Sequence, residues 1–228
     1  MLFGLACEGV TDQITIENIL CGYFDYPNLD EEITELQPPF DETSQKQKAG
    51  EIGGWTGLLN YYLCSQRFRD DVLNTRFVII QVDTDVSHEK GFDVAHIDAQ
   101  NRPLTPEVLI ENVVARLIAV IDSGEQGFYQ QHSEKIIFAI SVHSLECWLY
   151  AFHNKKPLSK PKITGCYKAL SYLRLFPSIE KTHRCYDSHS RFFLKHENID
   201  SVTTKDPSFR VFIKALSEIE EHVLKGLD

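Results

Sequence analysis

Short apolar runs alternate with amphipathic stretches along residues 1–153. Three runs are rich in β-branched and aromatic side chains and have the length of buried strands: residues 2–7, 77–82 and 135–142. Three further stretches repeat apolar residues at helical intervals: residues 12–22, 55–71 and 105–124. A weaker strand candidate covers residues 32–37. This order predicts an α/β fold with a central, mainly parallel sheet and helices on both of its faces.

Local signals place several helix starts. Thr11 or Asp12 is a suitable N-cap for the first helix, and Thr105, followed by Pro106, is a suitable N-cap for a later one. Ser144 is a candidate N-cap that leaves Glu146 in the first helical turn, where the helix dipole favours an acid. Polar loops are predicted for residues 41–54 and 86–102.

Beyond residue 153 the chain changes character. Residues 151–200 hold ten Lys or Arg against four Asp or Glu, whereas the whole chain has a net charge of −10. Helices are expected at about 164–175 and 206–225. We therefore divide the chain into an α/β domain at residues 1–153 and a basic, mainly helical extension at 154–228. A basic segment on an acidic protein is a candidate surface for phosphate groups.

Acidic residues follow three of the predicted strands. Glu8 comes after the first strand, Asp83 and Asp85 end the strand at 77–82, and Glu146 follows the strand at 135–142. Because the carboxyl ends of parallel strands open on one edge, these four carboxylates are expected to converge there. Oxygen ligands of this kind suit Mg²⁺ or Mn²⁺. The sequence therefore predicts a metal site formed by all four acids.

These motifs resemble the Toprim fold, a Rossmann-like α/β fold. They are Glu8-Gly-x-Thr-Asp, then Asp83-x-Asp85, then Ser144-x-Glu146, each after a strand. The set is similar to that of Toprim nucleases of the OLD-related and RloB-like kind. The resemblance implies metal-dependent phosphodiester hydrolysis in phage defence, with Glu8, Asp83, Asp85 and Glu146 as catalytic and metal-binding residues. A separate ATPase is an expected partner by analogy, because this chain has no Walker A motif.

Such nucleases also use a basic residue at the scissile phosphate. The candidates for contact with nucleic acid come from the basic region: Lys162, Lys168, Arg184 and Lys205. Whether the substrate is DNA or RNA, and whether the chain forms an oligomer, are left open by the sequence.

Two alternative functions remain. A Toprim-like module could bind a partner protein or nucleic acid without catalysis. The stretch Asp83-Thr-Asp85 also resembles the start of haloacid-dehalogenase phosphatases, in which the first Asp is a nucleophile.

The cellular context follows from the cysteines and the hydropathy. Six cysteines are scattered without a Cys-x-x-Cys pair, and no apolar run reaches the length of a membrane span. A cytoplasmic protein with reduced thiols is expected.

Overall fold

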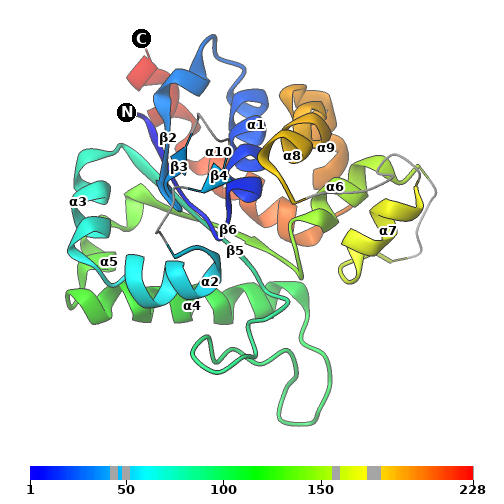
Figure 1. Ribbon diagram of the computed structural model, residues 1–228, viewed down its shortest axis with the longest axis horizontal. Helices are drawn as coiled ribbons and strands as arrows, with labels where there is room; N and C mark the ends of the chain where they lie inside the picture. Colours follow the sequence, from blue (N-terminus) through cyan, green and yellow to red (C-terminus); the bar gives the residue numbers. More distant parts are fainter. Residues whose placement is uncertain (42–45, 48–51, 156–159, 174–180, 228) are drawn as a thin grey trace.

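A four-stranded parallel sheet forms the centre of the molecule (Figure 1). The computed structural model describes residues 1–41, 46–47, 52–155, 160–173 and 181–227. In spatial order the strands are β2 (Ile33–Gln37), β1 (Phe3–Ala6), β5 (Phe77–Asp83) and β6 (Ile136–Ser141). Every neighbouring pair is parallel, so the four carboxyl ends share one edge. The predicted α/β class and parallel sheet are confirmed.

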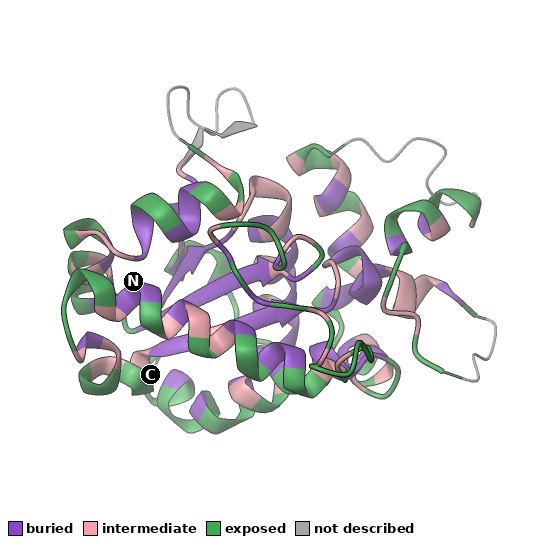
Figure 2. Cartoon of the chain, turned by 90° about the horizontal axis from the view of Figure 1, so that it is seen from below, coloured by how far each residue is buried: buried purple, intermediate pink, exposed green. Residues whose placement is uncertain are grey.

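Both faces of the sheet are covered, which explains the continuous apolar runs. Along β5, Ile79 packs in one hydrophobic cluster, while Val78 and Ile80 pack in another on the opposite face. This alternation follows from the two-residue period of a strand. Figure 2 shows the buried strands between helices whose outer surfaces are exposed.

Two layers of helices supply the partners of these faces. One layer holds α1 (Val10–Phe24), α8 (His183–Ser190), η4 (Arg191–Leu194), α9 (His196–Thr203) and α10 (Pro207–Leu227). The other holds α2 (Gly54–Gly57), the π-helical turn η2 (Leu58–Tyr62), α3 (Gln66–Asn74), α4 (Pro106–Gly124) and α5 (Phe128–His132). Shorter elements are η1 (Leu29–Glu32), η3 (Ser133–Lys135) and the hairpin β3 (Phe40–Asp41) with β4 (Lys46–Gln47).

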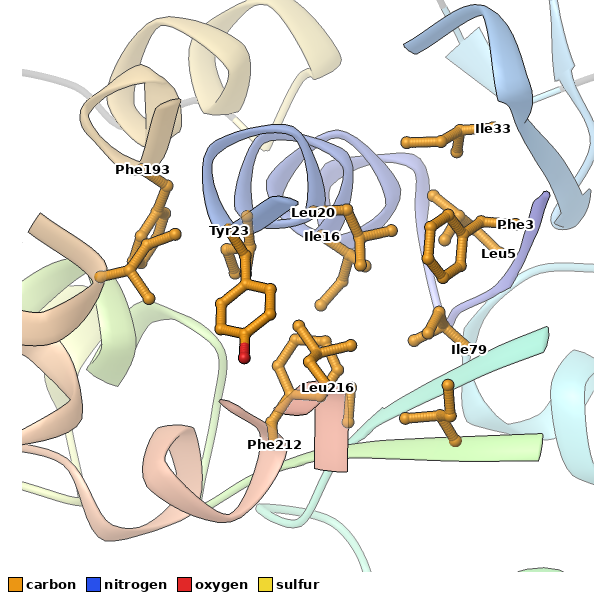
Figure 3. Packing of buried hydrophobic residues seen from close by; sticks show 14 of the residues in the cluster. Phe3, Leu5, Ile16, Leu20, Tyr23, Ile33, Ile79, Phe193, Phe212 and Leu216 are labelled. Carbon is orange, nitrogen blue, oxygen red and sulfur yellow. The ribbon is translucent and has the colours of Figure 1, made fainter. Parts of the chain in front are cut away.

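The C-terminal helices belong to the same core as the first strand. Phe3 and Leu5 from β1 lie in one cluster with Phe212 and Leu216 from α10, and α1 packs between the sheet and Phe193 of η4 (Figure 3). The described residues of the extension at 154–228 are thus a helical lobe of the α/β unit, since their buried side chains join this shared core.

Several local predictions need correction. The first helix begins at Val10 with Gly9 as its N-cap, so neither Thr11 nor Asp12 caps it. The single helix expected at 55–71 is interrupted: η2 ends at Tyr62, and Ser65 then caps α3 by accepting a hydrogen bond from the Phe68 amide. The Ser side chain competes for backbone donors, which is why it restarts the helix.

Two other helix starts agree more closely with the sequence. Thr105 accepts a hydrogen bond from the Val108 amide and caps α4, as predicted. α6 (Glu146–His153) begins two residues after Ser144, and its N-cap position is Leu145. Glu146 does lie in the first turn. α7 (Cys166–Tyr172) falls inside the stretch 164–175 that was expected to be helical.

The expectation of reduced thiols is wrong for one pair of cysteines. Cys147 on α6 and Cys166 on α7 form a disulfide, and the other four cysteines are not disulfide-bonded. Separately, the helices in the described part of the chain include none that is both long and apolar enough to cross a membrane.

Reduction of this disulfide is expected to destabilise the protein. The bond links residues 19 apart, and closing a loop of that length stabilises a fold by about 3 kcal/mol. Urea unfolding with and without a reductant measures the effect. A Cys166→Ser variant is the matched control, since its stability should not respond to the reductant. Equal stability of the oxidised and reduced wild-type protein would contradict the prediction.

Candidate active site at the carboxyl edge of the sheet

Glu8 joins the ends of the two central strands. It lies two residues beyond β1, and its Oε1 accepts a hydrogen bond of 2.9 Å from the backbone amide of Asp83 at the end of β5. β1 and β5 run side by side in register, with Ala6 opposite Ile80, so this contact needs only the short extension of β1 past the sheet. The carboxyl ends of β1 and β5 therefore meet, as the sequence predicted.

Asp83 is held by donors from three segments. Its Oδ1 accepts hydrogen bonds from Gln81 Nε2 at 3.0 Å, from Ser141 Oγ at 2.5 Å and from the Leu145 amide at 3.0 Å. These donors come from β5, from the end of β6 and from the start of α6. Three fixed donors on one oxygen leave the carboxylate little rotational freedom, so the group is preorganised.

Glu146 is buried beside a lysine. Its side chain accepts a hydrogen bond of 2.5 Å from the Tyr186 hydroxyl, and its Oε1 lies 3.5 Å from Nζ of Lys181. Burial alone would raise the pKa of Glu146. Attraction to Lys181 and hydrogen bonds from Ser144 and Tyr186 outweigh it and lower the pKa. Glu146 is thus held as a carboxylate, and the same attraction raises the pKa of Lys181 despite its partial burial.

The other acids of the cluster repel each other. Burial, together with the charge of Asp12, raises the pKa of Glu8 to about 8. Burial, together with the charge of Glu146, raises the pKa of Asp12 to about 7. The pKa of Asp83 is also raised, by burial and by Asp12, Glu8 and Glu146. The four carboxyl groups therefore interact electrostatically, and the raised pKa values of Glu8, Asp12 and Asp83 favour a bound proton or a cation.

Asp12 belongs to this cluster, although the sequence favoured a capping role for it. Its Oδ2 lies so close to Gly9 that a Cβ atom at position 9 would approach it to 3.2 Å. The first turn of α1 thereby directs Asp12 back toward Glu8. For brevity we call Glu8, Asp12, Asp83 and Glu146 the acidic cluster.

Asp85 does not lie with the other predicted ligands. β5 ends at Asp83, so the rule that residues i and i+2 point to one side no longer applies at residue 85. Asp85 is exposed in the following turn, where its backbone amide donates to the carbonyl of His143. Its charge still contributes to the raised pKa of Glu8, which places it at the margin of the acidic cluster.

Three histidines line the loop beside Asp85. His96 Nε2 lies 2.6 Å from the carbonyl oxygen of Thr84, and its ring packs edge-on against His88 and His143. Burial, followed by the neighbouring His96, lowers the pKa of His143. The contacts of His96 with Thr84 and Ser87 make it a support for the turn that carries Asp85.

None of the four predicted basic residues forms an ion pair with the acids in the described part of the chain. Lys205 donates to the carbonyl of Ala151, and Lys162 lies over the ring of Tyr150. Lys168 and Arg184 are exposed. Among the residues that the structure describes, the cation paired with the cluster is Lys181. It was counted in the basic region, but no local sequence feature distinguishes it from its neighbours.

The carboxylate oxygens of the acidic cluster suit a divalent cation, but their positions do not form a complete binding site for one. Carboxylate oxygens are the ligands that Mg²⁺ and Mn²⁺ prefer. However, no group of three or more His, Cys, Asp or Glu side chains in the described ranges is arranged to hold one ion. Since Mg²⁺ is usually bound by one or two carboxylates together with water and substrate phosphates, a complete protein cage is not required.

The fold and the cluster define a class: an α/β protein with a parallel sheet and an acidic site at its carboxyl edge, next to one lysine. Comparison with known proteins adds no family to this description. No family model, no curated protein and no solved structure matches the chain.

Proposed function

We propose that this protein is a divalent-metal-dependent nuclease of the Toprim type, which hydrolyses phosphodiester bonds. The main support is that Glu8, Asp83 and Glu146, each following a different strand, interact in one cluster with Lys181. The order of these acids along the chain matches the motifs on which the resemblance rests. The proposed cofactor is Mg²⁺ or Mn²⁺, which Glu8 and Asp83 would bind, with Asp85 at the margin of the site.

Each residue has a role that its surroundings favour. A bound divalent ion would neutralise the phosphate and activate the attacking water. Glu8, whose pKa is raised to about 8 without a cation, would release its proton when the ion binds and hold the ion as a carboxylate. Lys181, kept cationic by Glu146, is suited to stabilising negative charge on the phosphate. Asp83 is fixed by its three donors and keeps the geometry of the site constant.

The biological setting is proposed from the resemblance alone. It consists of phage defence, a nucleic acid substrate and a separate ATPase partner.

A cleavage assay tests the proposed function. The purified protein is incubated with plasmid DNA and with total RNA, in Mn²⁺ and in chelator. Cleavage that requires the metal and is lost in Glu8→Gln is the expected result. Glutamine keeps an oxygen acceptor for the Asp83 amide, so the fold should be retained.

Other outcomes favour the alternatives. Metal-independent binding of a partner without cleavage would favour the non-catalytic module. Release of phosphate from a small ester, with dependence on Asp83 greater than on Glu8, would favour the phosphatase.

A further inference from the structure

Helix α7 is attached to the helix that carries Glu146. The disulfide joins Cys166, the first residue of α7, to Cys147, which directly follows Glu146. Cys166 and Leu170, one turn apart, are both buried. One face of α7 is therefore fixed against α6 close to the acidic cluster, and Figure 1 shows α7 and α6 side by side at one end of the molecule.

Lys168 and Tyr172 lie on the side of α7 opposite Cys166 and Leu170, and Tyr167 lies on the flank that faces Lys181. We call these three residues the outer face of α7. Tyr167 is 40% exposed and Tyr172 is 72% exposed, and Lys168 is exposed as well. Lys168 and Tyr172 are four residues apart and so lie on the same side of the helix. Part of each tyrosine side chain is therefore accessible for stacking.

The charge around α7 is opposite to that of the molecule. Residues 160–173 contain three lysines and no Asp or Glu, although the net charge of the chain is −10. A surface of this kind attracts an anionic partner, whereas the rest of the molecule repels it.

Two pairs of a lysine and an aromatic ring connect this face to the acidic cluster. Nζ of Lys181 lies 3.5 Å from Glu146 and 5.6 Å from the centre of the Tyr167 ring. Nζ of Lys162 lies 6.0 Å from the centre of the Tyr150 ring, one turn after Glu146 on α6. Lysine side chains and aromatic rings therefore lie next to one another between the acidic cluster and the outer face of α7.

We infer that the outer face of α7, with Lys162 and Lys181, binds single-stranded nucleic acid and directs it to the acidic cluster. Lysines interleaved with exposed aromatic rings bind the phosphates and stack on the bases of a single strand. In a duplex the bases are stacked on one another, so the tyrosines could not stack on them and would add little binding energy. This inference rests on the proposed nuclease function and narrows its substrate to unpaired nucleotides.

Fluorescence anisotropy tests the inference separately from catalysis. A labelled single-stranded oligonucleotide of about 12 nucleotides is titrated with the protein in chelator, so that metal-dependent cleavage does not occur. The double variant Tyr167→Ala/Tyr172→Ala is expected to bind at least about 30-fold more weakly, since it removes two rings and stacking on one base contributes about 1–3 kcal/mol. The variant Tyr167→Phe/Tyr172→Phe keeps both rings and should bind like the wild-type protein.

Two controls complete the experiment. Tyr61→Ala removes an exposed tyrosine of η2, which belongs to the helix layer that contains α2, α3 and α4. This variant should bind with unchanged affinity. A duplex of the same sequence should bind more weakly than the single strand. Equal affinities of the wild-type protein and the double Ala variant, equal affinities for duplex and single strand, or no binding at all would overturn the inference.

The results also separate this inference from the proposed function. Binding that depends on the tyrosines, without any cleavage after metal is added, would support the α7 surface and contradict the nuclease. Metal-dependent cleavage with unchanged binding in the tyrosine variants would support the nuclease and contradict the α7 surface.

Discussion

Asp83→Asn is expected to lower metal-dependent cleavage about 1000-fold. A divalent ion contributes several kcal/mol of transition-state stabilisation, and each 1.4 kcal/mol is a factor of ten in rate. Asparagine has the same shape and keeps an oxygen for the three donors that hold Asp83, so the fold should be retained. It removes the negative charge that would attract the cation. Initial cleavage rates, measured at saturating Mn²⁺, give the ratio.

The control for this variant is Asp98→Asn. Asp98 lies in the loop before α4, where its side chain pairs with Arg102 and not with the acidic cluster. Its replacement makes the same chemical change and should leave the cleavage rate within about twofold, as is usual for surface substitutions. If both variants cleave like the wild-type protein, Asp83 is not part of an active site. Circular dichroism confirms that each variant is folded.

The stability of the protein is expected to fall as the pH rises from about 4.5 to about 8 in the absence of divalent ions. The carboxyl groups of Glu8, Asp12 and Asp83 have pKa values raised by burial and mutual repulsion, to about 8 for Glu8 and about 7 for Asp12. In this range the folded state therefore binds more protons than the unfolded state. The folded state is therefore destabilised relative to the unfolded state when a rising pH removes these protons. Each unit by which these pKa values are raised corresponds to about 1.4 kcal/mol of stability that is lost over this range.

Mg²⁺ should reverse this loss at the upper end of the range. An ion bound only by the folded state, at 100 times its dissociation constant, adds about 2.7 kcal/mol. Thermal melting at pH 5 and pH 8, with and without Mg²⁺, measures both effects. Glu8→Gln removes one of the repelling charges and should reduce the dependence on pH. A melting temperature that rises between pH 5 and pH 8 without the ion would contradict the raised pKa values of the acidic cluster.

The parts of the fold that were predicted from the sequence depend on local patterns. β5 and β6 are apolar runs buried on both faces, and α4 has its Thr105 cap next to Pro106. Glu8, Asp83 and Glu146 were predicted to meet because parallel strands place their carboxyl ends on one edge.

The missed features depend on tertiary structure. Lys181 reaches Glu146 across 35 positions of sequence, through the packing of α8 on α1, and a lone lysine in a basic stretch gives no sign of this. Asp12 was read as a cap, because a polar residue near a helix start has the same sequence signature in either role. Asp85 was misplaced because the strand ends two residues before it.

The shared core also bears on how the chain folds. The hydrophobic core around Phe3 of β1 also includes Phe212, Leu216 and Val223 of α10, which are about 210 to 220 positions later in the sequence. Contacts that join distant positions close large loops and slow the search for the native state. During synthesis, α1 would cover only part of this face of the sheet until α10 has emerged from the ribosome. A fragment that stops at residue 153 is therefore expected to expose this face and to aggregate, even though it carries all four acids of the cluster.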